Sequence, residues 1–225
     1  MPPPILFDPV QRPLRQARAA AIGDSFLVDH ALADARQRLA AIDRPKEALL
    51  VLRGDRPDPP APAPASLDAI VIAGALETVE ELPALMTALR HALRPDRPLL
   101  GSLIGGDSFP TLRRALVEAD RAMGRAAAPR AHPRIDAPSL AALLQHAGFA
   151  MPVVEVERTT LAYRSLGRLV ADLRAAGLTN QLAARPRGWP GRGWPQVLDA
   201  AFAAGRDRIE EPVEWLHFLA WSPPR

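Results

Sequence analysis

Two kinds of hydrophobic pattern alternate along this chain of 225 residues. Short, continuous apolar runs predict strands that are buried on both faces of a sheet. Stretches with an apolar residue at every third or fourth position predict helices with one apolar face. The predicted strands lie at residues 48–52, 67–73, 98–104 and 215–221, with a further one starting at 153–156; the predicted helices lie at 26–42, 82–93, 112–123, 139–147, 165–176 and 195–204. This alternation predicts an α/β fold, in which a largely parallel sheet is covered by helices on both faces.

Local signals mark where some of these helices begin. Residues 1–45 are expected to form an N-terminal helical region, with Asp24 or Ser25 as the N-cap of its main helix. Thr78 and Glu81 have the spacing of a capping box, which predicts that the next helix begins at Thr78.

A proline-rich segment separates the first two predicted strands, with prolines at positions 57, 59, 60, 62 and 64. Proline lacks a backbone donor and favours the extended polyproline conformation. Residues 57–66 are therefore predicted to be a linker. It lies inside one domain of residues 1–225, because a single α/β core of this size buries enough apolar surface to be stable.

Composition narrows the class of protein. Hydrophobic residues make up 48% of the chain and charged residues 24%, which is typical of a globular protein. The absence of cysteine excludes disulfides, thiolate metal sites and cysteine nucleophiles. No apolar run is long enough to cross a bilayer and the N-terminus lacks a signal-peptide pattern, so a cytoplasmic location is expected.

The charge pattern does not indicate a dedicated nucleic-acid surface. The net charge is +3 and Lys46 is the only lysine, an arginine bias that is typical of GC-rich bacterial genomes. Acidic residues are interspersed through most of the chain. The five histidines have no second histidine or carboxylate at a metal-ligand spacing on one helix face, so no metal site is expected.

Several short motifs occur in a characteristic order: LRHALRPD at 89–96, GGDSFPTLR at 105–113, APRAHP at 128–133, LLQHAGFAMPVV at 143–154, and Thr179-Asn180 followed by Arg185. Together they resemble a branch of the class I S-adenosylmethionine-dependent methyltransferases. This branch contains the malonyl-acyl-carrier-protein methyltransferase of biotin synthesis and the mitochondrial complex I assembly factor known as an arginine hydroxylase. The resemblance implies a Rossmann-like sheet with the strand order 3-2-1-4-5-7-6.

The chain departs from this family pattern in the half that binds the cofactor. The family has a glycine-rich loop after its first strand and an acidic residue after its second. Here only Gly54 stands at the loop position, and the linker leads directly to what resembles the fourth strand. The sequence therefore predicts a reduced Rossmann-like methyltransferase fold, with about five mostly parallel strands and an antiparallel C-terminal strand. Strands one and four would lie next to each other.

Two segments are candidates for cofactor contacts. Gly54 and Asp55 could be a vestige of the cofactor loop, or an ordinary turn after a strand. Gly74, Ala75 and Leu76 follow the strand that resembles the fourth of the family, where the resemblance implies the lining of the methyl-transfer cleft. The alternative is a strand end that needs small residues for a tight helix entry. Both segments are candidate S-adenosylmethionine contacts only if that site persists.

The segment before the helix at 112–123 is a candidate anion site. Gly105, Gly106 and Asp107 precede a helix N-terminus, where free N–H groups and the macrodipole favour a carboxylate or a phosphate. The alternative is that Asp107 or Ser108 caps the helix. Arg113 could pair with a substrate carboxylate, or remain solvated.

Residues 185–194 form the most unusual segment, since arginines and tryptophans alternate in a glycine- and proline-rich loop. Arg185, Trp189 and Trp194 could stack on bases, touch membrane headgroups or enter a groove of a partner, because Trp and Arg are enriched at binding hot spots. The alternative is a surface loop whose tryptophans fold back onto the core.

Three functions follow from these observations. The first is a methyltransferase-like pseudoenzyme without a cofactor, acting through contacts with a protein partner, as an assembly or maturation factor. The second is an active S-adenosylmethionine-dependent methyltransferase whose cofactor site is rebuilt or completed by a partner. The third is a nucleic-acid or membrane-surface binder that uses the 185–194 loop. A homodimer through the sheet edge beside the first strand is a further expectation.

Overall fold

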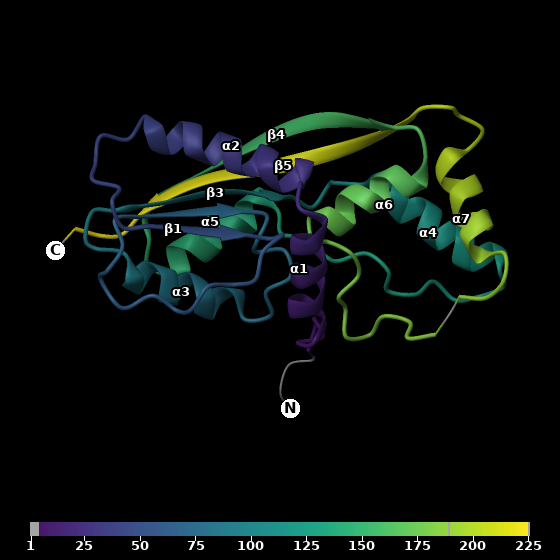
Figure 1. Cartoon of the computed structure of the whole chain (residues 1–225), viewed down its shortest axis with the longest axis horizontal. Coiled ribbons are helices and arrows are strands. Elements are labelled where there is room, and N and C mark those ends of the chain that lie inside the picture. The colour runs from purple at the N-terminus through teal and green to yellow at the C-terminus, as the bar shows by residue number, and fades with distance from the viewer. Residues whose placement is uncertain (1–4, 189, 225) are drawn as a thin grey trace.

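The computed structural model describes residues 5–188 and 190–224, which form one five-stranded sheet flanked by helices (Figure 1). The elements follow one another as α1 (Gln11–Ile22), α2 (Phe26–Ala40), β1 (Leu49–Arg53), β2 (Ala69–Ala73), α3 (Leu82–Ala92), β3 (Pro98–Ile104), α4 (Pro110–Ala122), α5 (Ala137–His146), β4 (Ala150–Tyr163), α6 (Leu166–Ala175), α7 (Trp194–Ala203) and β5 (Ile209–Trp221). The predicted α/β class is confirmed.

The strands lie in the order β1-β2-β3-β5-β4. β1, β2 and β3 pair in parallel, whereas β5 runs antiparallel to both β3 and β4. The mostly parallel sheet with an antiparallel C-terminal strand is therefore as predicted. β1 also lies next to β2, as expected for strands one and four. The segment that joins them, residues 54–68, contains neither a helix nor a multi-residue strand.

Helices cover both faces of the sheet, and successive residues of its buried strands face opposite layers. Val71 of β2 faces the apolar stripe of α2, while its neighbours Ile70 and Ile72 face α3 and α5. α4, α6 and α7 pack at the far end, against the part of the β4–β5 pair that extends beyond the other strands (Figure 1). The carboxyl ends of the parallel strands thus point toward the middle of the molecule, where α1 lies (Figure 1).

Burial differs between the edge and the centre of the sheet. Every residue of β2 and β3 is buried, as their continuous apolar runs predicted. β1 was also expected to be buried on both faces, and this was wrong: it is an edge strand, and Leu49 is 40% exposed. Prolines of the linker lie beside Leu50 and Leu52 around a cavity and cover part of β1. A homodimer through this edge stays a prediction.

Three other boundaries differ from the sequence prediction. The N-terminal region is two helices that Gly23 separates, although Ser25 does cap α2 as predicted. The capping box is wrong, because α3 begins at Leu82 without a side-chain cap and the Thr78 hydroxyl accepts a hydrogen bond from Arg12 instead. β4 and β5 are longer than predicted, since charged residues interrupt their apolar pattern, on an exposed face in β4 and in buried positions at Glu211 and Glu214 of β5.

Candidate functional site

Ligands of open α/β sheets bind beyond the carboxyl ends of the parallel strands. Two regions of this chain lie there. One is the turn at the end of β1, residues 54–56, called here the β1 turn. The other is a cavity of about 230 Å³ beyond the ends of β2 and β3, called here the crevice.

Backbone packing closes the β1 turn. The Gly54 N–H donates a 2.9 Å hydrogen bond to the carbonyl of Ala73, the last residue of β2. A β-carbon at Gly54 would lie 1.9 Å from the carbonyl oxygen of Gly74. Gly177, at the end of α6, is packed against Gly54 from another side, with 2.7 Å between its hypothetical β-carbon and the Gly54 carbonyl. Three backbone segments, at residues 54, 74 and 177, therefore meet here, and the absence of a side chain at Gly54 allows this.

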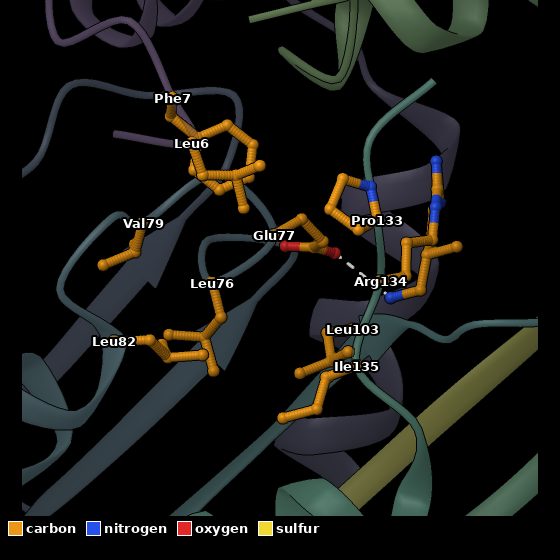
Figure 2. Close-up of a pocket in the computed structure, with 11 residues that line it drawn as sticks. Leu6, Phe7, Leu76, Glu77, Val79, Leu82, Leu103, Pro133, Arg134 and Ile135 are labelled. Atoms are coloured by element: carbon orange, nitrogen blue, oxygen red, sulfur yellow. Dashed lines mark hydrogen bonds between the residues drawn. The ribbon is translucent and has the colours of Figure 1, made fainter. Parts of the chain in front are cut away.

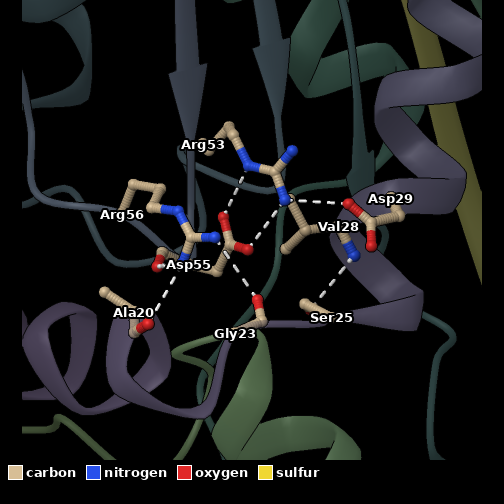
Figure 3. A network of polar contacts seen from close by, with 8 residues as sticks. All are labelled: Ala20, Gly23, Ser25, Val28, Asp29, Arg53, Asp55 and Arg56. Carbon is tan, nitrogen blue, oxygen red and sulfur yellow. Dashed lines mark hydrogen bonds and ion pairs between the residues drawn. The ribbon is translucent and has the colours of Figure 1, made fainter.

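Asp55 is fully buried and is held by Arg53 (Figure 3). The guanidinium Nε and Nη2 of Arg53 each donate a 2.8 Å hydrogen bond to one carboxylate oxygen of Asp55. Arg53 also contacts Asp29 of α2 at 2.8 Å, and these carboxylates raise its pKa, the hydrogen bond that Arg53 donates to Asp55 being the largest cause. Arg56 donates to the carbonyls of Ala20, in the last turn of α1, and of Gly23 after it. The polar side chains of this turn are thus bound by other groups of the protein.

The crevice has mostly apolar walls (Figure 2). Its apolar lining consists of Leu6, Phe7, Leu76, Val79, Leu82, Leu103, Ile104, Pro133 and Ile135. The backbone N–H groups of Leu6 and Phe7 donate to the carboxylate of Glu80 at 2.8 and 2.6 Å, which fixes the N-terminal segment along one wall. Gly74 turns the chain out of β2 with φ +61°, and Ala75 and Leu76 are buried behind it.

Glu77 brings a carboxyl group into this apolar surrounding. Its Oε1 accepts a 3.1 Å hydrogen bond from the Ile104 N–H, but its buried Oε2 has no partner in the structure. Burial raises the pKa of Glu77, and the hydrogen bond from Ile104 opposes this only in part. A carboxyl group in such a place holds its proton more strongly than usual, which suits a hydrogen-bond donor or a general acid.

The loop that precedes α5 carries two basic side chains, Arg134 and His132. Arg134 lines the crevice together with Glu77, whereas His132 packs against Phe7. Burial lowers the pKa of Arg134 to about 10, against the opposing charge of Glu77, and its buried Nη1 has no partner. The Arg134 guanidinium lies 5.0 Å from the ring centroid of Phe109. Burial likewise lowers the pKa of His132 to about 4, so its imidazole is neutral at pH 7. His132 accepts a 2.8 Å hydrogen bond from Gln181 N–H, while its buried Nδ1 is unpartnered.

The sequence did not single out Glu77, His132 or Arg134. Each is a single charged or polar residue in an irregular loop, and no fixed spacing relates them. One signal was present for Glu77, because an acidic residue that follows a buried strand and the apolar Ala75-Leu76 pair is out of place in an ordinary surface turn.

The candidate anion site before α4 is filled by the protein itself. The Glu211 carboxylate of β5 accepts 2.9 Å hydrogen bonds from the N–H groups of Thr111 and Leu112. The expected cap by Asp107 or Ser108 is therefore wrong, because the long β5 brings its own carboxylate to the helix N-terminus.

The residues around this helix start have other partners. Asp107 is 79% exposed and lies 3.8 Å from Arg158, and the Ser108 hydroxyl bonds with the backbone of Glu214. Gly105 packs closely against the Glu214 side chain, and Arg113 donates to the Gly106 carbonyl at 2.8 Å.

The 185–194 loop is tied to the body of the protein at two described points. Arg185 donates to Asp8 and to the Leu182 carbonyl, at 2.8 and 2.9 Å. Trp194 begins α7, and its indole donates to Asp120 at 2.9 Å, with Arg130 stacked 4.5 Å from the ring centroid. For Trp194 the structure supports the alternative of a tryptophan folded back onto the core. Trp189 lies outside the described residues.

Comparison with known proteins gives relatives of one kind, although no family model matches the chain. The malonyl-[acyl-carrier protein] O-methyltransferase of Xylella fastidiosa (strain M23) is 35% identical over 178 residues, which cover 78% of this chain and 58% of that protein. The mitochondrial arginine hydroxylase NDUFAF5 of Danio rerio is 25% identical over 115 residues, covering 51% of this chain and 36% of that protein. The chain spans a little over half the length of the first two curated relatives that it matches.

Among solved structures, a candidate methyltransferase of Bacillus halodurans C-125 superposes with a TM-score of 0.51. The match covers 85% of this chain and 98% of that one at 12% sequence identity, and it therefore concerns the fold alone. Within the described part of the chain, no helix has the length and apolar character needed to cross a membrane.

Proposed function

Because this chain is a methyltransferase-like protein of the branch that contains the malonyl-[acyl-carrier protein] O-methyltransferases and the arginine hydroxylase NDUFAF5, we propose that it keeps the fold without the cofactor site. In this proposal S-adenosylmethionine does not bind at the end of β1. The crevice is then the binding site that remains. The protein acts through contacts with a protein partner, as an assembly or maturation factor would.

The observation that supports this proposal most is the filled β1 turn. A cofactor that lies over the end of the first strand needs backbone N–H groups that are free to approach it, and a vestigial contact by Asp55 would need a free carboxylate. Gly54 instead touches Gly74, and both oxygens of Asp55 are bound by Arg53 inside the protein. The residues present therefore do not fit the methionine and ribose groups of S-adenosylmethionine, so no chemical step is assigned to that cofactor.

Buried polar atoms without hydrogen-bond partners lower the stability of the protein, and in the crevice the same atoms support a binding role. Within the described part of the chain, one oxygen of Glu77 and one nitrogen of Arg134 are buried there without a partner, and a ligand group could satisfy them. Glu77 in its protonated form would donate a hydrogen bond to an acceptor, and Arg134 would donate one to an anionic or carbonyl oxygen. A polar side chain of a protein partner that enters the apolar crevice can supply both the acceptor for Glu77 and the oxygen for Arg134.

Isothermal titration of the full chain with S-adenosylmethionine and S-adenosylhomocysteine tests the proposal directly. The expected result is no binding up to millimolar concentration. The malonyl-[acyl-carrier protein] O-methyltransferase of Xylella fastidiosa, titrated in the same buffer, shows that the ligands and the instrument are sound. Micromolar binding to the isolated chain would overturn the proposal.

The relation to malonyl-[acyl-carrier protein] O-methyltransferases favours one alternative, an active S-adenosylmethionine-dependent methyltransferase with a rebuilt cofactor site. Such a site would use Gly74, Ala75 and Leu76 together with the crevice, or it would be completed by a partner chain. This alternative predicts that Glu77→Gln weakens S-adenosylmethionine binding by about tenfold, which corresponds to one charge-assisted hydrogen bond. The same titration with this variant separates the alternatives, because the proposal expects no binding by either form.

A further inference from the structure

A second concave surface lies apart from the crevice, between α1 and the segment that leads into α7. Its volume is about 770 Å³, and we call it the arginine basin. The charged residues that line it are Asp8, Arg15, Arg130, Arg185 and Arg187. Four guanidinium groups therefore face one carboxylate, in a molecule whose net charge is only +3.

Two of these arginines are held in place by carboxylates. Arg130 donates two 2.8 Å hydrogen bonds to Asp120, which is 1% exposed, and it stacks on Trp194. Arg185 is fixed by Asp8 and the Leu182 carbonyl. Their remaining N–H groups are thus preorganised, because little side-chain freedom is left to lose when a ligand binds.

Arg15 and Arg187 carry the uncompensated charge of the basin. Within the described part of the chain, neither forms an ion pair with a carboxylate. The buried Nε of Arg15 has no hydrogen-bond partner. The charged groups that act on Arg15 are themselves arginines, at positions 18, 174 and 185, and they lower its pKa in addition to the larger effect of burial. Positive charge therefore accumulates here without an internal anion to balance it.

We propose that the arginine basin is a binding site for a compact phosphate-bearing ligand, with Arg15 and Arg187 supplying charge and Arg130 and Arg185 supplying fixed donors. Guanidinium forks bind phosphate oxygens in pairs, more strongly than they bind neutral groups. A concave surface suits a small polyanion better than an extended nucleic acid, which would need a long basic stripe. The described tryptophan beside the basin, Trp194, is already bonded to Asp120, and Arg130 covers its ring. This inference does not rest on the proposed function.

Inorganic pyrophosphate is the probe for this site, titrated calorimetrically into the full chain at low salt. The expected result is binding with a Kd below about 1 mM that weakens as salt is added. Arg15→Gln should weaken binding at least tenfold, and Arg187→Gln should weaken it several-fold. Arg15→Lys, which keeps the charge but loses the fork, should fall between Arg15→Gln and the unchanged chain.

Arg36→Gln is the matched control, because it removes one positive charge from an exposed position on α2, outside the basin. Circular dichroism of each variant establishes that it is folded. If Arg15→Gln does not fold, Arg187→Gln and Arg15→Lys decide the outcome. Absence of pyrophosphate binding, or equal loss in Arg36→Gln and the basin variants, would overturn the proposal. Tighter binding of single-stranded DNA or of a poly-glutamate peptide would overturn it in favour of a macromolecular ligand.

Discussion

The β1 turn and the crevice lie at the same edge of the sheet, and both hold buried charged side chains. In the β1 turn, both carboxylate oxygens of Asp55 accept hydrogen bonds from Arg53. In the crevice, buried side-chain atoms of Glu77 and Arg134 have no hydrogen-bond partner among the described residues. Leaving a buried polar atom unsatisfied costs about 1–3 kcal/mol. The first region is thus built as structure, whereas the second keeps an unfavourable arrangement that a ligand could relieve.

Two glycines that stand at similar places in the sequence differ in how closely they are packed. Gly54 and Gly106 both follow parallel strands. A β-carbon at Gly54 would strike the Gly74 carbonyl, while one at Gly106 would meet nothing closer than 3.8 Å. The first is required by close packing of backbone segments, and the second is not.

Gly54→Ala is expected to have the largest effect. The clash with the Gly74 carbonyl forces β1 and β2 apart at their ends, so the free energy of unfolding should fall by about 4 kcal/mol or more. Urea unfolding followed by circular dichroism measures it. Gly106→Ala serves as the control and should change stability by less than about 1 kcal/mol. Equal stability of the two variants would show that the β1 turn is not closed as described.

Asp55→Ala comes next. It leaves the Arg53 guanidinium without its buried partner, and removal of one member of a buried pair costs about 3–5 kcal/mol. The value should lie at the low end of that range, because Arg53 is partly exposed and keeps Asp29. Asp29→Ala removes the exposed partner of the same arginine and should cost less than about 1 kcal/mol. A small effect of Asp55→Ala, with cofactor binding changed instead, would favour a ribose contact.

His132→Gln tests the burial of a neutral imidazole in the crevice region. The pKa of His132 is lowered from 6.5 to about 4, so protons bind the unfolded chain more readily than the folded one in that interval. The contribution of His132 to stability is complete above pH 6.5 and is lost as the pH falls toward 4, by up to about 3 kcal/mol. The variant should show a flatter stability profile between these pH values, measured by urea unfolding at several pH values. Identical profiles would contradict a buried, neutral His132.

Glu77→Gln should have the smallest effect, and in the opposite direction. The amide oxygen can still accept from Ile104 N–H, while the cost of burying an ionised carboxylate disappears. Because the folded-state pKa is raised above 4.5, the unsubstituted chain loses stability as the pH rises above that value. The variant should therefore be more stable by about 1 kcal/mol at pH 8 and equally stable at pH 4. Thermal unfolding at the two pH values checks this. A destabilised variant at pH 8 would mean that Glu77 is already paired.

Elements buried on both faces were predicted well from the sequence, because burial imposes a continuous apolar run. The run at 98–104 is β3 at the same residues, and the run at 67–73 contains β2. The N-cap at Ser25 was predictable because the hydroxyl acts on its own helix, three residues away. The ends of β4 and β5 were not, since charged residues interrupt the apolar pattern: β4 is an exposed edge strand, and buried carboxyl groups of β5 are bonded by distant parts of the chain.

Contacts between distant parts of the chain account for the errors at the candidate sites. Glu211 reaches the start of α4 across about a hundred residues, so no local pattern indicates that it replaces Asp107 or Ser108. Thr78 does not cap α3 as expected, because its hydroxyl accepts a hydrogen bond from Arg12, which is distant in the sequence. Glu77 and His132 come from separate loops, and neither loop alone indicates a binding site.

The sequence by itself determined the alternation of strands and helices, the lack of any segment between residues 57 and 66 that could form a further strand, and the kinship to a methyltransferase branch. These features depend on local composition, periodicity and motif order. Only the tertiary structure decided that Asp55 is bonded inward, that Glu77 is left unpaired, and that Arg15 joins a basin of arginines. Whether a charged side chain is satisfied depends on which distant groups the fold brings within about 3 Å of it, and spacing along the chain does not encode that.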